Sequence, residues 1–225
     1  MSQLAFFALC AYRVPKFNSS LLLSQKRPFS RRYREFQKER REMRVLQVNV
    51  GLPRLVRYKG EPILTGIFKQ PVAGRVKVNK LNLQGDRQAD LRVHGGYYKA
   101  VYAYPSEHYD YWREELPEMN LPYGMFGENL TTEGLLETDV KADDRFRIGT
   151  AEFVVTQPRF PCFKLGIRFN RPDIVERFAG SGRSGFYMAI EKTGVLEAGD
   201  KVEFLNGEAN QVNIAEMFKR RFNLK

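Results

Sequence analysis

An apolar strand, Phe153-Val154-Val155-Thr156, runs directly into a proline-stiffened turn, Gln157-Pro158-Arg159-Phe160-Pro161-Cys162-Phe163-Lys164-Leu165-Gly166. Each proline removes a backbone donor and favours an extended conformation in the residue before it. We therefore expect this turn neither to continue the strand ladder nor to begin a helix easily. It should hold the thiol of Cys162 at the end of a strand.

The neighbourhood of Cys162 in the sequence is basic, because Arg159 and Lys164 flank it. Nearby cations favour the thiolate over the thiol, and the thiolate is both the nucleophile and the metal ligand. Two interpretations stay open at this point. Cys162 is either a functional thiolate or a small buried hydrophobe, which is the usual role of a free cysteine.

Short strands surround this segment on both sides. Runs rich in β-branched and aromatic residues, bounded by Gly, Pro or Asn, predict strands over 45–50, 63–68, 75–78, 99–104, 129–132, 145–148, 152–156, 186–190 and 201–205. Helices are predicted over 107–116, 172–178 and 214–222, with Trp112 facing the core, Gly180 just past the second helix and Asn213 before the third. Close strands with few helices predict a mainly β fold with peripheral helices, as a curved sheet or barrel.

The cysteine and histidine counts limit the chemistry. The two cysteines, Cys10 and Cys162, argue against a disulfide framework and for a reducing compartment, which we take to be the cytoplasm. The two histidines, His94 and His108, are too few to complete a tetrahedral zinc site with these cysteines.

Most of the positive charge lies near the N-terminus. Residues 1–42 hold ten Lys or Arg and three Glu, so they carry +7 of the net charge of +11 and leave +4 for residues 43–225. The apolar segment 4–11 is short and has no preceding positive charge, which is untypical of a secretory signal and too short to span a bilayer. Two interpretations of this segment stay open: a transit peptide, or an untranslated stretch before a start at Met43.

We expect a basic, disordered leader over 1–42, one domain over 43–205, and a tail over 206–225 with one short helix.

Two glycine-rich segments are candidates for ligand binding. In Val93-His94-Gly95-Gly96, followed by Lys99, paired glycines let the backbone approach a ligand and leave amides free for an anion. The segment Gly180-Ser181-Gly182-Arg183-Ser184-Gly185 precedes a strand, whereas a phosphate-binding loop needs a helix there. A surface loop, or a mobile lid carrying Arg183, are its open interpretations.

Five segments together resemble the MOSC family, named for the C-terminal domain of molybdenum cofactor sulfurase. They are Gly85-Asp86-Arg87-Gln88-Ala89-Asp90, Val93-His94-Gly95-Gly96, Lys99-Ala100-Val101-Tyr102-Ala103-Tyr104-Pro105, Gly127-Glu128-Asn129-Leu130 and the Cys162 segment. They occur in the family's order across residues 43–205. The sequence is most similar to the bacterial stand-alone branch that includes 6-N-hydroxylaminopurine reductase.

The resemblance implies a MOSC-type β-barrel that binds a molybdenum cofactor of the molybdopterin type. Cys162 matches the cysteine whose thiolate coordinates molybdenum, a role that suits a soft ligand. The residues that match the cofactor pocket are His94, Gly95, Gly96, Lys99 and Asn129. Arg159 would face the terminal phosphate of the cofactor or its oxo-molybdenum centre. A pyridoxal phosphate-binding label also attaches to the family. Tyr97-Tyr98 replaces the expected Pro-acid pair, which would reshape the pocket rim or alter substrate preference.

Three functions follow as alternatives. The first is a molybdenum-dependent oxidoreductase that reduces small N-hydroxylated compounds such as hydroxylamino-purines, with a flavoprotein-type electron donor and no membrane partner. The second is a non-redox sulfur or molybdenum-cofactor carrier, with Cys162 held as a persulfide. The third is a nucleic-acid-binding barrel, which the small excess charge of residues 43–225 argues against.

We expect deletion of residues 1–42 to leave the melting temperature and ligand content of the protein unchanged. The leader has few periodic apolar residues, so ordering it would cost entropy without compensating burial. Thermal unfolding of the truncated and full chains checks this. A markedly lower melting temperature of the truncated chain would show that the leader belongs to the domain.

Overall fold

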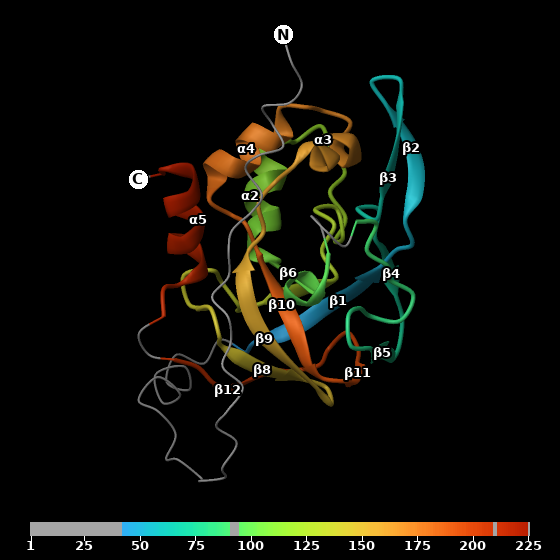
Figure 1. Cartoon of the computed structure of the whole chain (residues 1–225). Helices are drawn as coiled ribbons and strands as arrows, with labels where there is room; N and C mark the ends of the chain where they lie inside the picture. Colours follow the sequence, from blue (N-terminus) through green and yellow to red (C-terminus); the bar gives the residue numbers. More distant parts are fainter. Residues whose placement is uncertain (1–41, 91–94, 209–210, 225) are drawn as a thin grey trace.

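The computed structural model describes residues 42–90, 95–208 and 211–224 (Figure 1). Most of the strands in this part of the chain form one sheet of eight, in the order β12-β8-β9-β10-β6-β7-β1-β4. These strands are β1 (Arg44–Val50), β4 (Gln70–Val72), β6 (Val101–Pro105), β7 (Leu130–Glu133), β8 (Arg145–Ile148), β9 (Ala151–Pro158), β10 (Phe186–Lys192) and β12 (Val202–Asn206). Neighbours pair antiparallel except β6 and β7, which are parallel.

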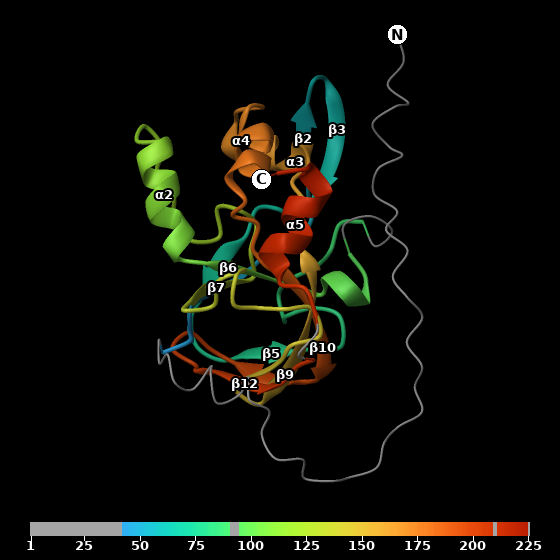
Figure 2. The same cartoon turned by 90° about the vertical axis from the view of Figure 1, so that its left-hand side faces the viewer.

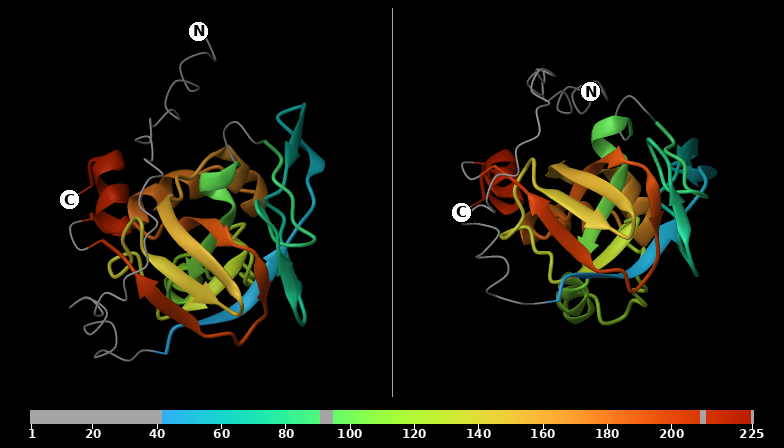
Figure 3. Two further views of the ribbon diagram at one scale, coloured as in Figure 1. Left: turned by 60° about the horizontal axis from the view of Figure 1, so that its bottom comes forward. Right: turned by 90° about the horizontal axis from the view of Figure 1, so that it is seen from below.

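The sheet curls until β1 meets the β12 side. Arg44 and Lys201 form an antiparallel bridge, and the amide of Val45 donates to the carbonyl of Asp200 at 2.9 Å. Figure 3 shows the strands curving round a common interior. The predicted mainly β, barrel-type fold with peripheral helices is confirmed. An isolated bridge, rather than a continuous ladder, joins β1 to the β12 side.

Two small sheets lie outside the large one. Strand β5 (Val76–Val78) pairs with β11 (Gly194–Leu196), and β2 (Arg54–Tyr58) forms a hairpin with β3 (Glu61–Thr65). The hairpin projects beside helix α3 (Phe163–Phe169) in Figure 1. Strands β2, β4 and β11 were missed by the sequence analysis, since each is short and lacks an extended apolar run.

The helices gather toward one end of the sheet, as Figures 1 and 2 show. Besides α3 they are α2 (Glu107–Glu115), α4 (Ile174–Ser181) and α5 (Ile214–Phe222), and a short 3-10 helix, η2 (Tyr97–Lys99), lies against β10. In the part of the chain that the structure describes, no helix is long and apolar enough to cross a membrane.

The hydrophobic core has two parts. The larger cluster draws aliphatic and phenylalanine side chains from the strands of the large sheet. The second is aromatic and lies between the sheet and the helices, with Tyr104, Tyr109, Trp112, Phe126 and Phe178 all fully buried. Trp112 Nε1 donates to Tyr104 Oη at 2.8 Å, and the Tyr104 and Phe126 rings stack with centroids 4.6 Å apart. The prediction that Trp112 faces the core is confirmed.

The expectation that no helix begins easily after the proline turn is wrong. Cys162 is extended, with φ −139° and ψ 172°, and α3 starts at the next residue. A proline restricts the residue before it, so Pro161 acts on Phe160 and leaves residues after Cys162 free to turn helical. Leu165 and Phe169 drive the turn by burying their side chains in the aromatic cluster.

The other predicted helices are observed with small changes. The tail helix spans the predicted residues 214–222, and the Asn213 side chain caps it by accepting from the Glu216 amide at 2.7 Å. Helix α4 continues past the predicted end, so Gly180 lies inside it. Gly182, with φ 69°, terminates it instead, because only a residue that tolerates the left-handed region fits there.

A buried carboxylate organises the loop that leads into β7. Glu128 is fully buried, and its side chain accepts hydrogen bonds from the amides of Gly124 at 2.6 Å and Phe126 at 3.1 Å. The Thr131 hydroxyl donates at 3.0 Å, and Tyr109 Oη donates to the same side chain. Burial raises the pKa of Glu128, against the lowering effect of these donors. The carboxylate therefore ties helix α2 and strand β7 to the loop.

We expect Glu128→Gln to destabilise the fold by at least about 2 kcal/mol. The amide would turn an NH₂ group toward these donors, and each buried donor left unpaired costs about 1–3 kcal/mol. Chemical denaturation measures the loss. Glu114→Gln on the exposed face of α2 is the matched control and should stay within about 0.5 kcal/mol of the wild type. An equal effect of the two substitutions would show that the Glu128 network is not stabilising.

Candidate functional site

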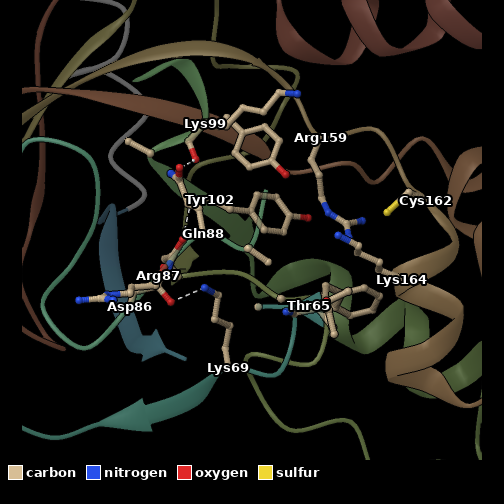
Figure 4. A pocket seen from close by; sticks show the side chains of 18 residues that line it. Thr65, Lys69, Asp86, Arg87, Gln88, Lys99, Tyr102, Arg159, Cys162 and Lys164 are labelled. Carbon is tan, nitrogen blue, oxygen red and sulfur yellow. Dashed lines mark hydrogen bonds and ion pairs between the residues drawn. The ribbon is translucent and has the colours of Figure 1, made fainter. Parts of the chain in front are cut away.

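A cleft that is partly open to solvent lies where the β3–β4 connection, the start of β6 and the turn before α3 meet (Figure 4). The cations that line it are Lys69, Arg87, Lys99, Arg159 and Lys164, against one carboxylate, that of Asp86. This balance of charge favours an anionic ligand.

Cys162 contributes its thiol to one wall of the cleft. It is half-buried at the start of α3, where its carbonyl accepts from the Leu165 amide at 2.9 Å. Arg159 and Lys164 line the same cleft. The residues that the sequence analysis grouped around the thiol therefore also share one site in space.

Arg159 is a buried cation with unused hydrogen-bonding capacity. Its side chain is 5% exposed, with the guanidinium carbon 5.3 Å from the Tyr102 ring centroid and 5.1 Å from that of Phe178. Among the described residues, no group accepts a hydrogen bond from Nη1. Burial opposes its charge, but the neighbouring Tyr102, Tyr187 and Cys162 raise the pKa of the guanidinium overall. A buried, unsatisfied donor is costly, so this nitrogen is placed for an acceptor that a ligand would bring.

The floor of the cleft is a network around Asp86. Its Oδ1 accepts from the Gly51 amide at 2.8 Å and from Lys69 Nζ, while its Oδ2 accepts from Asn129 Nδ2 at 3.0 Å. Asn129 Oδ1 in turn accepts from the Tyr102 amide at 3.1 Å. Asn129 lines the cleft, yet both ends of its amide are hydrogen-bonded within the protein and hold the strands in place.

The two glycines of the His-Gly-Gly turn lie outside the cleft lining, whereas Lys99 is part of it. Gln88 holds this turn, because its Oε1 accepts from the Gly96 amide at 2.7 Å and its Nε2 donates to the Lys99 carbonyl at 3.1 Å. Gly96 has φ 86°, and a Cβ on Gly95 would come within 2.4 Å of Gln88 Oε1. Both glycines serve this close approach. His94 lies outside the described residues.

Two further candidates from the sequence are not part of the cleft. Tyr97 and Tyr98 are exposed and do not line the cleft. Their rings contact one another edge to face, with centroids 5.2 Å apart. The expectation that this pair reshapes the pocket rim therefore finds no support in their position. Arg183 lies 3.7 Å from the centroid of Tyr111, and the loop that follows it is held by hydrogen bonds to the Ser184 carbonyl and the Gly185 amide. It fits a fixed surface loop better than a mobile lid.

The side chains of the cleft suit a metal whose other ligands come from an organic cofactor. In the described ranges, no three Cys, His, Asp or Glu side chains gather as a metal site. A single soft thiolate beside an unsatisfied guanidinium and several cations suits an anionic organic cofactor that carries its metal and needs one protein ligand. The residues present are therefore compatible with a molybdopterin-type group, which Cys162 would hold at the metal and Arg159 at an anionic part.

Comparison with known proteins identifies the family. The MOSC domain model matches residues 90–203, within the predicted domain 43–205. The chain belongs to the MOSC domain family. The Bacillus subtilis (strain 168) protein YflK is 40% identical over 179 residues, which is 80% of each chain. The crystal structure of YiiM from Geobacillus stearothermophilus aligns with a TM-score of 0.65 at 35% identity, over 79% of this chain and 82% of that one.

A third MOSC relative is much longer. The Gibberella moniliformis (strain M3125 / FGSC 7600) protein named "Reductase" is 37% identical over 164 residues, which is 72% of this chain and 29% of that protein. The region that this chain matches is thus one part of a longer protein.

Several residues of this MOSC site escaped the sequence analysis. Lys69, Arg87 and Tyr187 line the cleft from three separate segments. Arg87 lay in a motif already singled out, but Lys69 follows a short apolar run and looks like a solvated charge. The signal in the sequence that could have identified Lys69 is its position as a lone lysine between two predicted strands. Its partner Asp86 lies in a motif that the sequence analysis had already singled out.

Proposed function

We propose that this protein is a molybdenum-cofactor-dependent reductase of small N-hydroxylated compounds, such as hydroxylamino-purines. The observation that carries the proposal is one cleft that holds a single thiol, that of Cys162, beside the unsatisfied guanidinium of Arg159. Membership of the MOSC family and the likeness to a protein named "Reductase" support the same reaction class.

The side chains of the cleft have distinct tasks in this proposal. The Cys162 thiolate is the protein ligand of molybdenum, and Arg159 and Lys99 neutralise anionic groups of the cofactor. The Asp86 network fixes the floor against which cofactor and substrate lie. When bound, the cofactor supplies the two electrons that cleave the N–O bond, and a flavoprotein-type donor in the cytoplasm replaces them.

A sulfur carrier is the second candidate. The half-buried thiol of Cys162 lies beside Lys164 and Arg159, which would also stabilise an anionic persulfide. The two functions differ in what the purified protein holds. A reductase contains molybdenum in stoichiometric amounts and turns over, whereas a carrier contains labile sulfane sulfur and does not.

Cys162→Ser should abolish reduction of N-hydroxylated substrates and molybdenum retention while leaving the fold intact, because a hard hydroxyl is a poor substitute for a soft thiolate. The measurements are molybdenum per chain and turnover of 6-N-hydroxylaminopurine with reduced methyl viologen, after expression in a host that makes the cofactor. Cys10→Ser is the matched control and should behave as the wild type. Metal and turnover retained in Cys162→Ser would refute the ligand assignment, and sulfane sulfur in a metal-free wild type would favour the carrier.

Arg159→Ala should lower molybdenum content more than it lowers stability, since Nη1 of its buried guanidinium has no acceptor among the described residues and is placed for an anionic ligand. Metal analysis and thermal unfolding of the same preparations separate the two effects. Arg147→Ala, which removes two ion pairs at the surface, is the control and should keep the wild-type metal content. Full metal content in Arg159→Ala would contradict this assignment and would mean that the anionic part of the cofactor binds elsewhere.

A further inference from the structure

A second group of cations lies beside the cleft, between helix α3 and the β2–β3 hairpin, which Figure 1 shows next to one another. Arg54 on β2 and Arg168 on α3 both lie against the ring of Phe68, with their guanidinium carbons 3.5 Å and 5.2 Å from its centroid. Phe68 stands between Ile67 and Lys69, which line the cleft. Two segments far apart in the sequence thus bring two arginines together at the edge of the site.

The guanidinium of Arg168 has unused hydrogen-bonding capacity. Its Nε is buried, and no group in the described part of the chain accepts a hydrogen bond from it. Burial lowers the pKa of Arg168, and the charge of Arg54 lowers it too, against the raising effect of Glu128. Glu128 already accepts hydrogen bonds from the amide and hydroxyl donors around it. A buried donor without an acceptor is costly, so Arg168 Nε, like Nη1 of Arg159, is placed for an acceptor that a ligand would bring.

The charges of this pair are not compensated by an ion pair. Other cations on the surface have carboxylate partners, as Arg145 has in Glu191 at 2.9 Å. Neither Arg54 nor Arg168 forms an ion pair with any described residue. Two like charges held near one another repel, so folding alone gains little from this arrangement. Because both groups lie against one ring, an anion beside that ring can contact both and offset their charges.

A phosphate monoester is the ligand that suits two arginines. It carries nearly two negative charges, and its oxygens accept the parallel N–H groups of guanidinium. The distance from the thiol limits what can carry this phosphate. Arg168 follows Cys162 by six residues along α3, which is about 9 Å in a helix that rises about 1.5 Å per residue. A ribose between a base and its phosphate bridges a gap of this order.

We propose that Arg54 and Arg168 form a subsite for the phosphate of a nucleotide substrate, an N-hydroxylated purine nucleoside 5′-monophosphate. This inference rests on the proposed reductase function and deepens it, because it names the form in which the base is reduced. The base lies on the Cys162 side of the cleft, and its phosphate lies between the hairpin and α3. Arg159 serves the cofactor, whereas the Arg54–Arg168 pair serves the substrate.

Kinetics with a matched set of substrates tests the subsite. The set is 6-N-hydroxylaminopurine, its riboside and the riboside 5′-monophosphate, each assayed with reduced methyl viologen. We expect wild-type kcat/KM to be at least about tenfold higher for the monophosphate than for the riboside, as a charge-assisted contact provides. Arg54→Gln and Arg168→Gln should each bring the ratio of these two values close to one. Arg57→Gln removes the same charge from the opposite face of β2, so it is the matched control and should keep the wild-type ratio.

Binding to the full chain purified without cofactor gives a second measurement that needs no turnover. In isothermal titration, adenosine 5′-monophosphate should bind at least about tenfold more tightly than adenosine, and Arg168→Gln should remove this difference. Equal kcat/KM for the riboside and the monophosphate in the wild type would overturn the inference. So would an equal loss for all three substrates in both variants, which would indicate a purely structural role. Loss of molybdenum from Arg54→Gln and Arg168→Gln would assign the phosphate to the cofactor and would also overturn it.

Failure of the underlying function has a different result. If the wild type lacked molybdenum and turnover yet bound the monophosphate through Arg168, the reductase proposal would fall. The assignment to a reduced substrate would fall with it, and Arg168 would remain a phosphate contact. If the wild type reduced the riboside and the monophosphate equally well, the reductase would stand and the phosphate subsite would fall.

Discussion

The carboxylate of Asp86 is the interaction on which the cleft depends. It joins the end of β1 through the Gly51 amide, the entry to β4 through Lys69, and the entry to β7 through Asn129. Asn129 extends the network to β6 through the Tyr102 amide. A buried carboxylate is tolerated only when its oxygens are hydrogen-bonded, and here each bond comes from a different segment. Loss of any one partner would therefore loosen several walls of the cleft together. The turn that carries Asp86 therefore forms a floor for the site whether or not a ligand is bound.

The charges of the cleft are balanced on one side and unbalanced on the other. Lys69 and Asp86 compensate one another at the floor, and Glu128 is compensated by hydroxyl and amide donors beneath it. Among the described residues, Arg159 has no such partner for Nη1, although its side chain is also buried. Folding alone gains little from burying Nη1 there, because no acceptor among the described residues offsets its desolvation. An anionic ligand would offset it, which is the physical reason for the cofactor position proposed above.

The aromatic cluster explains how such a site is kept rigid. Tyr102 and Tyr104 lie on β6, and Phe126, Trp112 and Phe178 pack around them from a loop and two helices. Arg159 rests against Tyr102 and Phe178, so the guanidinium is positioned by rings that are themselves immobilised. Interiors packed in this way have few alternative arrangements, and a ligand would meet a preformed geometry. In the longer MOSC relative named "Reductase", the same kind of region makes up only part of the chain.

The strand-rich class, the helices after Pro105 and Asn213, and several segments that meet at the cleft could be predicted from the sequence. These features depend on local periodicity, on caps and on ordered motifs, all of which lie within a few residues of one another. The sequence also singled out Cys162, Arg159, Lys99 and Asn129, which do come together. The start of α3 directly after Cys162 depends on long-range packing, because burial of Leu165 and Phe169 against distant rings stabilises that helix. Likewise, Lys69 became a buried partner of Asp86 through a contact across 17 residues, and burial of a charge is a property of the folded surroundings that no local pattern records.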